Sequence, residues 1–247
     1  MLYICVPTYN EAPTVGVLLW RIRKMFQDYS REYEVLVYDD ASTDATSEVL
    51  TPYADVLPLR VLRGEKRLGY GQALQALCRE ASRRTHYARR DAMVVMQGDF
   101  TDQPDMLPEL VKRFEGGADI VVAERSAETM PLAVRRLSRV APWMIRPFIA
   151  TNGVADPFNS FRLYRLSLLR ELLKAGGDAP IITTDGWAAN VELLVKLMPL
   201  ARKIETVSVV PRYDLRPRES RIRPLPDAWS LYKYTKQSRR WRAKVSA

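Results

Sequence analysis

Hydrophobic and polar positions along this chain follow two patterns that alternate. Short, continuous apolar runs are typical of strands that are buried on both faces of a parallel sheet. Between them lie longer stretches in which apolar residues recur every three or four positions, the spacing of an amphipathic helix. The runs predict strands over Leu2–Val6, Tyr33–Tyr38, Leu59–Leu62, Ala92–Met96 and Asp119–Ala123. The periodic stretches predict helices over Ala12–Phe26, Thr43–Leu50, Gln72–Ser82 and Met106–Phe114.

This alternation of strand and helix predicts an α/β fold, with a mostly parallel sheet and helices on both faces. The pattern weakens beyond Arg125, where residues 126–151 mix basic, proline and apolar residues without a clean period. Helices are predicted again over Leu166–Leu173 and Val191–Met198, and a last strand over Ile204–Val210. A chain of 247 residues is long enough for one large domain with a substantial core, so we expect a single domain.

Composition excludes several classes of protein. Apolar residues make up 47% and charged residues 27% of the chain, close to globular averages. We find no apolar run near the roughly 20 residues that cross a bilayer, and residues 1–7 lack the features of a signal peptide. We therefore expect a cytosolic protein. Cys5 and Cys78 lie in apolar patterns without a CxxC pair, so we expect small buried side chains there.

The formal net charge of +9 is concentrated near the C-terminus. From Pro211 onward there are eleven basic and three acidic residues, so this segment carries +8 of that charge. Such a segment attracts nucleic acid, an anionic membrane surface or a phosphorylated substrate through the same long-range field. Aromatic residues interleaved with these charges suit a membrane headgroup layer and also suit base stacking. They are Trp229, Tyr232, Tyr234 and Trp241. A solvated basic helix that packs its aromatics on the domain is the structural alternative.

A polar segment follows the predicted strand over residues 92–96. Its sequence is Gln97-Gly98-Asp99-Phe100-Thr101-Asp102. In open α/β sheets, ligands bind at the carboxyl ends of the strands. A carboxylate placed there, with amide and hydroxyl oxygens beside it, can hold a hard divalent cation against a diphosphate group. A turn that only ends the strand is the alternative.

Three other loops leave predicted strands with suitable chemistry for a nucleotide. The segment Pro7-Thr8-Tyr9-Asn10-Glu11 offers an aromatic ring and a carboxylate, which suit a base and a ribose. The segment Asp39-Asp40-Ala41-Ser42-Thr43-Asp44 offers carboxylates that can accept hydrogen bonds from a base imide or ribose hydroxyls. Asp40 or Ser42 could instead cap the following helix. Gly69 and Gly71 form a Gly-x-Gly turn, which is a weak signal without the full dinucleotide spacing.

In their order along the chain, these motifs resemble those of family 2 glycosyltransferases, especially polyprenyl-phosphate members similar to dolichyl-phosphate mannose synthase. The resemblance spans residues 2 to about 225. Gln97-Gly98-Asp99 stands where the family has Asp-x-Asp, and Ala123-Glu124-Arg125 stands where it has Gly-Ser-Arg. The segment over residues 156–162, Asp-Pro-Phe-Asn-Ser-Phe-Arg, resembles the family's Asp-x-x-Ser-Gly-Phe-Arg. Residues 216–221, Arg-Pro-Arg-Glu-Ser-Arg, resemble its Arg-x-x-Gly-x-Ser-Lys/Arg loop.

The resemblance implies a GT-A fold, which is Rossmann-like, and inverting transfer of a sugar from a nucleotide-sugar donor with Mg2+ or Mn2+ as cofactor. It also implies a division of the chain. Residues 1–125 would form the nucleotide-binding half of the domain and residues 126–225 its acceptor half, followed by a basic aromatic tail over residues 226–247.

Individual roles follow from the same resemblance. The donor would be held by Pro7, Tyr9, Glu11, Asp39 or Asp40, Gly69 and Gln97. Asp99 would bind metal and diphosphate, with Gln97 and either Thr101 or Asp102 as further metal ligands. Phosphate groups would be faced by Arg125 and by Arg135 or Arg136. The late loop would close over donor or acceptor phosphate through Arg218, Ser220 and Arg221.

The chain departs from the family pattern at three points. Gln97 replaces the first carboxylate of the metal motif, Ser160 replaces a glycine, and the late loop is one residue short with Glu219 in place of glycine. Losing a carboxylate weakens a site for a hard cation. Three interpretations remain: an enzyme with a looser metal site, an enzyme that uses arginines in place of metal, or a degenerate module that binds nucleotide sugar without turnover.

Asp156 and Asp185 are the candidate catalytic bases, because each lies in a polar break late in the chain. A polyprenyl phosphate is already an anion at neutral pH, whereas a sugar hydroxyl would need a true base. His86, the only histidine, lies in a basic helical segment, and we expect it on the surface.

Two other classes of protein fit less well. A nucleic-acid-binding protein would explain the basic tail, but no motif of a recognition module is present. A nucleotidyltransferase usually opens with a glycine-rich loop that bears lysine or arginine. We therefore expect a cytosolic glycosyltransferase, peripheral at the inner face of the plasma membrane through its tail, with no nucleic-acid partner. Its acceptor would be a lipid phosphate or a lipid-linked molecule, and a soluble sugar is the alternative.

Overall fold

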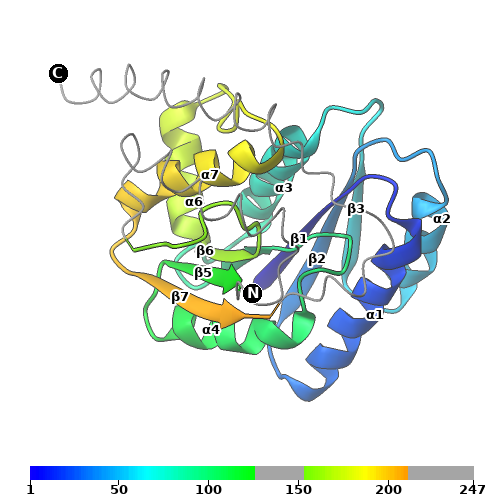
Figure 1. The fold of residues 1–247 in the computed structure, drawn as a ribbon, viewed down its shortest axis with the longest axis horizontal. Coiled ribbons are helices and arrows are strands. Elements are labelled where there is room, and N and C mark those ends of the chain that lie inside the picture. Colours follow the sequence, from blue (N-terminus) through cyan, green and yellow to red (C-terminus); the bar gives the residue numbers. More distant parts are fainter. Residues whose placement is uncertain (126–152, 211–247) are drawn as a thin grey trace.

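A seven-stranded sheet forms the centre of the computed structural model, which describes residues 1–125 and 153–210 (Figure 1). The strand order is β3-β2-β1-β4-β6-β5-β7. The strands are β1 (Leu2–Thr8), β2 (Tyr33–Asp39), β3 (Leu59–Arg63), β4 (Ala92–Val95), β5 (Ile120–Arg125), β6 (Arg162–Arg165) and β7 (Ile204–Val209). All neighbours pair in parallel except β6, which runs antiparallel to both β4 and β5. The mostly parallel sheet expected from the sequence is confirmed.

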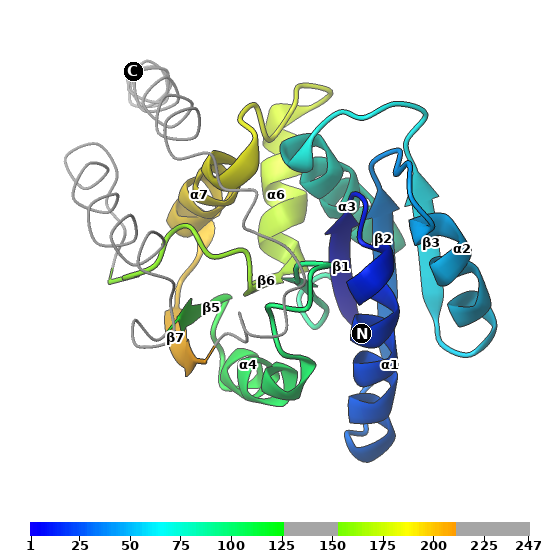
Figure 2. The ribbon, with the colours of Figure 1, turned by 45° about the vertical axis from the view of Figure 1, so that its right-hand side comes forward.

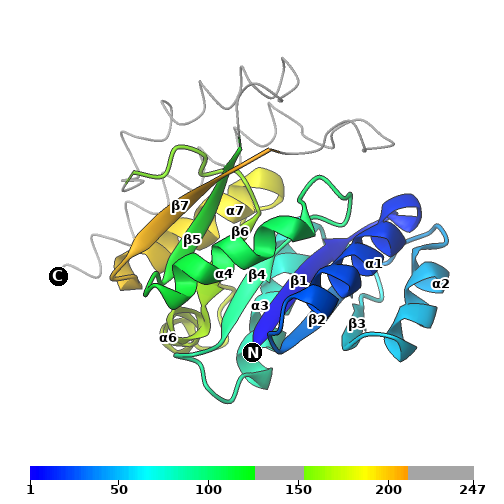
Figure 3. The same ribbon diagram turned by 90° about the horizontal axis from the view of Figure 1, so that it is seen from below.

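Helices cover both faces of this sheet. One layer holds α3 (Tyr70–Arg84), α6 (Leu166–Gly176) and α7 (Gly186–Leu197), which pack side by side (Figure 2). The other layer holds α1 (Ala12–Asp28), α2 (Thr46–Leu50) and α4 (Leu107–Glu115) (Figure 3). Short 3-10 turns occupy Thr51–Asp55, Pro104–Met106 and Met198–Leu200.

The core follows from the two periods in the sequence. Along β1, Ile4 and Val6 pack into the layer of α1 and α4, whereas Tyr3 and Cys5 pack into the layer of α3, α6 and α7. Strands that are apolar at every position are therefore buried on both faces. In α4 the buried side chains are Leu107, Leu110, Val111 and Phe114, the stripe that an amphipathic helix presents to a sheet. Cys5 and Cys78 are buried and unbonded, as expected.

Each strand and helix predicted from the described part of the sequence is present, but three details are corrected. The helix predicted from Thr43 begins at Thr46, because the Asp44 carboxylate accepts the Thr46 N–H and holds the preceding residues in a turn. The helix predicted from Val191 begins at Gly186. The strand β6 was not predicted, since it has only four residues, begins and ends with arginine, and lies close behind a turn-rich segment.

The second half of the sheet is fastened by a buried carboxylate, which gives a stability prediction. Asp119 accepts hydrogen bonds from Arg165 Nε (2.7 Å) and from the Arg202 N–H (2.9 Å). Burial raises the pKa of Asp119, but the hydrogen bonds from Arg202 and Arg165 outweigh burial and leave the pKa below its usual value. We expect Asp119→Asn to lower the free energy of unfolding by about 3 kcal/mol at pH 7, measured by urea denaturation.

Because the folded-state pKa is depressed, this stabilisation is present above the unfolded pKa of about 4 and is lost as the pH falls through the folded value. The difference between the variant and the original protein should therefore shrink in acid. Asp105→Asn is the matched control, since Asp105 forms an exposed ion pair with Arg21 and should cost less than about 1 kcal/mol. Equal losses in both variants would contradict this account.

Candidate active site

Loops from four parallel strands meet at one edge of the sheet. Because β1, β2, β3 and β4 run in parallel, their carboxyl ends lie at the same edge. The loops after β1 and β2 are joined: the Thr43 N–H donates to Asn10 Oδ1 (2.8 Å), and the Asn10 N–H donates to Ser42 Oγ (2.9 Å). We call this edge, formed by residues 7–11, 39–46, 64–71 and 97–102, the rim.

Backbone strain is concentrated in the rim. Among the described residues, three that are not glycine have a left-handed backbone: Asn10 (φ 51°), Ala41 (φ 55°) and Phe100 (φ 62°). They lie in the loops after β1, β2 and β4. Such conformations cost roughly 1–3 kcal/mol each and tend to persist where a functional site requires them. The left-handed residues therefore make the rim a candidate functional site, on grounds that do not depend on the motifs.

Asp39 is a buried carboxylate with an oxygen left for a ligand. Its side chain is fully buried, and Oδ1 accepts the Ser42 N–H at 3.0 Å. Oδ2 has no hydrogen-bond partner, and its nearest cation is the largely exposed Arg63, whose Nε lies 3.8 Å away. A buried acceptor without a donor is costly. Asp39 can therefore accept an N–H or O–H group of a bound molecule.

Asp40, the neighbouring carboxylate, is fully engaged by the protein. Its two oxygens accept the Leu68 and Gly69 N–H groups, each at 2.8 Å. Asp40 thus ties the carboxyl end of β2 to the loop after β3. Of the two aspartates left open by the sequence, Asp39 has the geometry of a ligand-binding group and Asp40 that of a structural one. Burial raises the pKa of Tyr38, and the neighbouring carboxylates of Asp40 and Asp39 raise it further.

Tyr9 and Glu11 lie in the loop after β1. The Arg67 guanidinium stacks on the Tyr9 ring, with its carbon 3.9 Å from the ring centroid. Glu11 is buried, and its Oε2 lies 3.2 Å from the Thr14 hydroxyl, which also lies 2.8 Å from Gly98 O. A Cβ on Gly98 would come within 3.3 Å of the Glu11 side chain. The loops after β1 and β4 therefore pack in direct contact.

The loop after β4 carries the predicted metal ligands. Asp99 is buried and accepts the Thr101 N–H (3.1 Å), and Asp102 accepts the Gln97 N–H (2.9 Å). Gln97 Nε2 donates to Ser160 Oγ at 3.0 Å, which leaves its amide oxygen on the other side of the group. The Thr101 hydroxyl is buried and has no hydrogen-bond partner. Two residues that depart from the family pattern, Gln97 and Ser160, are thus bonded to each other.

These donors fit a cation that takes few protein ligands. Two carboxylates, an amide oxygen and an unpaired hydroxyl lie within six residues, and such oxygens suit Mg2+ or Mn2+. Within residues 1–125 and 153–210, no group of three or more acidic, histidine or cysteine side chains is arranged to hold a metal ion. The loop therefore fits an ion that shares its coordination with phosphate oxygens and water, and does not fit an all-protein cage.

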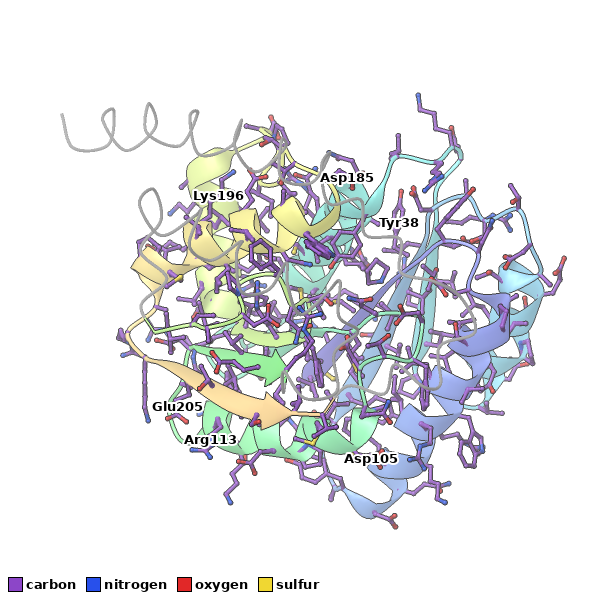
Figure 4. All side chains as sticks on the ribbon, viewed as in Figure 1. Tyr38, Asp105, Arg113, Asp185, Lys196 and Glu205 are labelled. Carbon is purple, nitrogen blue, oxygen red and sulfur yellow. The ribbon has the colours of Figure 1, made fainter. Side chains whose placement is uncertain are left out.

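The Gly-x-Gly turn serves a close backbone approach. Gly69 has a positive φ of 95°, and the Gly71 N–H donates to Asp185 Oδ1 at 2.8 Å. A Cβ on Gly71 would lie 2.1 Å from Thr184 O, so no other residue fits there without a shift. This contact brings the exposed Asp185, which lies at the start of α7 and is labelled in Figure 4, to the rim.

Arg125 and Asp156 form a two-pronged ion pair beside the loop after β4. Nε and Nη2 of Arg125 lie 2.7 and 3.1 Å from the two carboxylate oxygens. Asp156 Oδ1 also accepts the Phe158 and Asn159 N–H groups, each at 3.2 Å. Arg125 lines a hollow that also includes Thr101. Asp156 is therefore placed to hold Arg125, and a role for it as a catalytic base stays a prediction.

The structure brings together most of the site residues that the sequence suggested. The rim and its neighbours contain Pro7, Tyr9, Glu11, Asp39, Asp40, Gly69, Gln97, Asp99, Thr101, Asp102, Arg125, Asp156 and Asp185. Five others lie outside the described residues: Arg135, Arg136, Arg218, Ser220 and Arg221. His86 is exposed on the segment between α3 and β4, as expected.

Two residues near the rim were missed by sequence reasoning. Arg67 stacks on Tyr9, but a basic residue in an exposed loop gives no signal of that contact. Glu192 is fully buried in α7 and binds the loop that carries Asp185. A signal for it was present, since Glu192 interrupts a helix face where Val191, Leu193 and Leu194 are all buried. A lone carboxylate in such a setting needs partners.

Among the described helices, none is both long and apolar enough to cross a membrane.

Comparison with known proteins identifies relatives of similar architecture. The chain is 28% identical over 199 residues to a dolichol-phosphate mannosyltransferase of Pyrococcus furiosus, covering 78% of this chain and 52% of the relative. It is 25% identical over 198 residues to an undecaprenyl-phosphate 4-deoxy-4-formamido-L-arabinose transferase of Edwardsiella ictaluri, covering 78% and 58%. The chain thus spans little more than half the length of these curated relatives.

Solved structures share the fold. The glucosyl-3-phosphoglycerate synthase of Mycobacterium tuberculosis, in complex with Mn2+, UDP-glucose and phosphoglyceric acid, has a TM-score of 0.67 at 20% identity, covering 97% of this chain and 79% of that one. Residues 1–349 of TarS from S. aureus, in complex with UDP-GlcNAc, have a TM-score of 0.58 at 17% identity, covering 85% and 57%. These likenesses confirm the GT-A fold expected from the sequence.

A family model described as glycosyl transferase family 2 matches residues 3–173, more than half of the chain. The matched region contains the rim loops, the strained residues and the Arg125–Asp156 ion pair. The chain therefore belongs to glycosyl transferase family 2.

Proposed function

We propose that this protein transfers a sugar from a nucleotide-sugar donor to a lipid phosphate of the polyprenyl type, with inversion at the transferred carbon. The observation that carries the proposal is Oδ2 of the buried Asp39, which accepts no hydrogen bond from the protein, in a rim of strained loops. The curated relatives named above act, by their names, on dolichol phosphate or undecaprenyl phosphate. A solved structure of the same fold holds a UDP-sugar together with Mn2+.

The nucleoside would bind between the loops after β1, β2 and β3. Asp39 Oδ2 accepts a hydrogen bond from the base or the ribose, which satisfies the buried acceptor. The Arg67 guanidinium already lies over the Tyr9 ring, with its carbon 3.9 Å from the centroid, so a base would add to an existing cation–π contact. Pro7 and Glu11 shape the wall next to this stack, where Gly98 permits close packing.

The diphosphate would lie along the loop after β4. Asp99 and Asp102, with the Gln97 amide oxygen, would hold Mg2+ or Mn2+, which supplies Lewis-acid stabilisation of the departing nucleoside diphosphate. Arg125 lines a hollow together with Thr101 and Asp102, where its guanidinium group would meet phosphate oxygens. Asp156 holds Arg125 in a fixed direction, so the Arg125 guanidinium group needs no reorganisation as charge develops on the leaving group.

Asp185 would contact the sugar. It is exposed at the rim, is held through the Gly71 N–H, and is placed by the start of α7. Its carboxylate can accept hydrogen bonds from sugar hydroxyls. A lipid phosphate acceptor is an anion already, so Asp185 need not remove a proton from it, whereas a sugar hydroxyl acceptor would require Asp185 as base.

The lipid acceptor implies work at a membrane surface. The segment from Pro211 onward carries a net charge of +8 and five aromatic residues, a composition that suits an anionic bilayer surface. We therefore place the protein at the cytoplasmic face of the plasma membrane as a peripheral protein.

The donor site gives the first functional prediction. Asp39→Asn keeps the shape of the side chain but places an NH2 group where the ligand donates, so nucleotide affinity should fall about tenfold to a hundredfold. Isothermal titration with UDP and GDP measures this loss. The control is Asp55→Asn, an exposed carboxylate on the same half of the chain, which should leave affinity unchanged. Unchanged affinity in Asp39→Asn would remove Asp39 from the nucleoside site.

The loop after β4 gives the second functional prediction. Asp99→Ala should reduce sugar transfer at least about a hundredfold while leaving the thermal unfolding midpoint within a few degrees, because Asp99 acts on the leaving group. Transfer is measured with a panel of nucleotide sugars and a polyprenyl phosphate. Asp105→Ala, an exposed aspartate shortly after this loop, is the control and should retain full turnover.

The same loop can be tested in the opposite direction. Gln97→Asp adds a carboxylate and should tighten Mn2+ binding in the presence of UDP about tenfold.

Retained turnover in Asp99→Ala would exclude Asp99 from the mechanism. Nucleotide binding without turnover of any donor would favour the alternative of a binding module.

The basic tail gives the third functional prediction. Removing residues 226–247 deletes six basic residues, and we expect weaker co-sedimentation with liposomes that contain anionic lipid and no change with neutral ones. High salt should remove the difference, since exposed charges are screened. A variant with the aromatics of this segment replaced separates insertion from charge. Equal co-sedimentation of the full and shortened chains would dismiss a membrane role for the tail.

A further inference from the structure

A fully buried carboxylate in α7 binds the backbone of an irregular loop. Glu192 has no exposed surface, yet it accepts five hydrogen bonds. Oε2 accepts the N–H groups of Thr183 and Thr184, each at 2.9 Å, and the Thr184 hydroxyl at 2.7 Å. Oε1 accepts the Thr183 hydroxyl at 2.9 Å and Lys196 Nζ at 2.7 Å. Four of these five bonds come from two residues that directly precede Asp185.

Glu192 keeps its charge at this position. Burial raises the pKa of the carboxyl group, but the Lys196 ammonium and the threonine hydrogen bonds outweigh it, so the net pKa is below the usual value. Lys196 also donates to Ile181 O at 2.9 Å, which fastens the start of the same segment. A buried ion pair of this kind is weak evidence for stability, because an apolar pair often does as well. An apolar side chain, however, could not bind two successive backbone N–H groups.

The loop held by Glu192 reaches the rim in two further contacts. Thr184 O occupies the space beside Gly71, and Asp185 Oδ1 accepts the Gly71 N–H at 2.8 Å. On the other side of this turn, Asp40 binds the Gly69 N–H at 2.8 Å. Hydrogen bonds therefore link the last turn of α7, where Figure 4 marks Lys196, through Glu192 and the loop over residues 183–185 to the Gly69–Gly71 turn.

We propose that Glu192 is a positioning residue that fixes the Thr183–Asp185 loop, and through it Asp185, against the Gly69–Gly71 turn. This inference rests on the proposed function for the role of Asp185 toward the sugar. Glu192 itself lies away from solvent and touches no substrate. Its effect is to hold an exposed carboxylate at the rim in one place, because both backbone N–H groups before Asp185 are committed to it.

The test compares two variants of the same ion pair. Glu192→Gln keeps the shape of the side chain but puts an NH2 group against N–H and O–H donors, so the loop loses two or more of its bonds. Lys196→Met removes the counter-charge and the bond to Ile181 O, and leaves all four threonine bonds in place. We expect both variants to lower the unfolding midpoint, and only Glu192→Gln to lower kcat for sugar transfer tenfold or more, with Lys196→Met changing it less than threefold.

A double substitution tests whether Glu192 acts through Asp185. If it does, Glu192→Gln combined with Asp185→Asn should have a kcat within about twofold of Asp185→Asn alone, because the positioned group is already lost. Hydrogen exchange gives a readout without turnover. Peptides that contain the Thr183, Thr184 and Gly71 amides should exchange at least tenfold faster in Glu192→Gln than in Lys196→Met.

The outcomes separate this inference from the proposed function. Equal kcat losses in Glu192→Gln and Lys196→Met, multiplicative losses in the double variant, or unchanged exchange at Thr183 and Thr184 would overturn the positioning role. Faster exchange confined to that loop and the Gly71 turn, in a protein that transfers no sugar from any donor to a polyprenyl phosphate, would support the positioning role and reject the proposed function.

Discussion

The contact between the Gly69–Gly71 turn and the backbone of Thr184 and Asp185 is the constraint on which the site depends. It joins the loop after β3, in the first half of the chain, to the start of α7 in the second. Since a Cβ on Gly71 would lie 2.1 Å from Thr184 O, the two backbones meet only where a side chain is absent. Asp40 accepts the Leu68 and Gly69 N–H groups, which fixes this turn to the end of β2. One glycine contact thus sets the distance between the loops after β2 and β3 and the Asp185 carboxylate at the start of α7.

The carboxylates of the site fall into two groups according to the hydrogen bonds that they accept. Those with both oxygens bound to the protein shape the site: Asp40 holds the turn, Asp156 holds Arg125, and Glu192 holds the loop before α7. Asp39 is the opposite case, because it is equally buried and yet has an oxygen without a hydrogen-bond donor. Burial alone does not separate these roles. The separation comes from asking where each polar atom finds its partner, since a buried acceptor without one is retained at a cost that a ligand can offset.

Sequence patterns predicted the parallel sheet and the loops at its edge, because apolar runs and helical periods are local properties. They also placed Asp39, Asp99 and Arg125 at strand ends. Two kinds of feature escaped them. Strand β6 is short, contains arginines and pairs in the antiparallel direction, so its formation depends on neighbours far away in the chain. The difference between Asp39 and Asp40 depends on the Leu68 and Gly69 N–H groups, about thirty residues away, and no local pattern contains that information.

The bond between Gln97 and Ser160 changes how the cation site should be understood. Each residue alone is a departure that weakens the resemblance to the family, but the two are hydrogen-bonded at 3.0 Å, from the loop after β4 to the segment before β6. A carboxylate in place of Gln97 would add charge and bind a cation more tightly. An amide fixed by Ser160 offers a neutral oxygen instead, so the protein's share of the cation's ligands carries less charge. Under the proposed function, the diphosphate of the donor would supply the rest, so that cation binding would be coupled to donor binding, with Arg125 as a positive charge contributed by the described part of the protein.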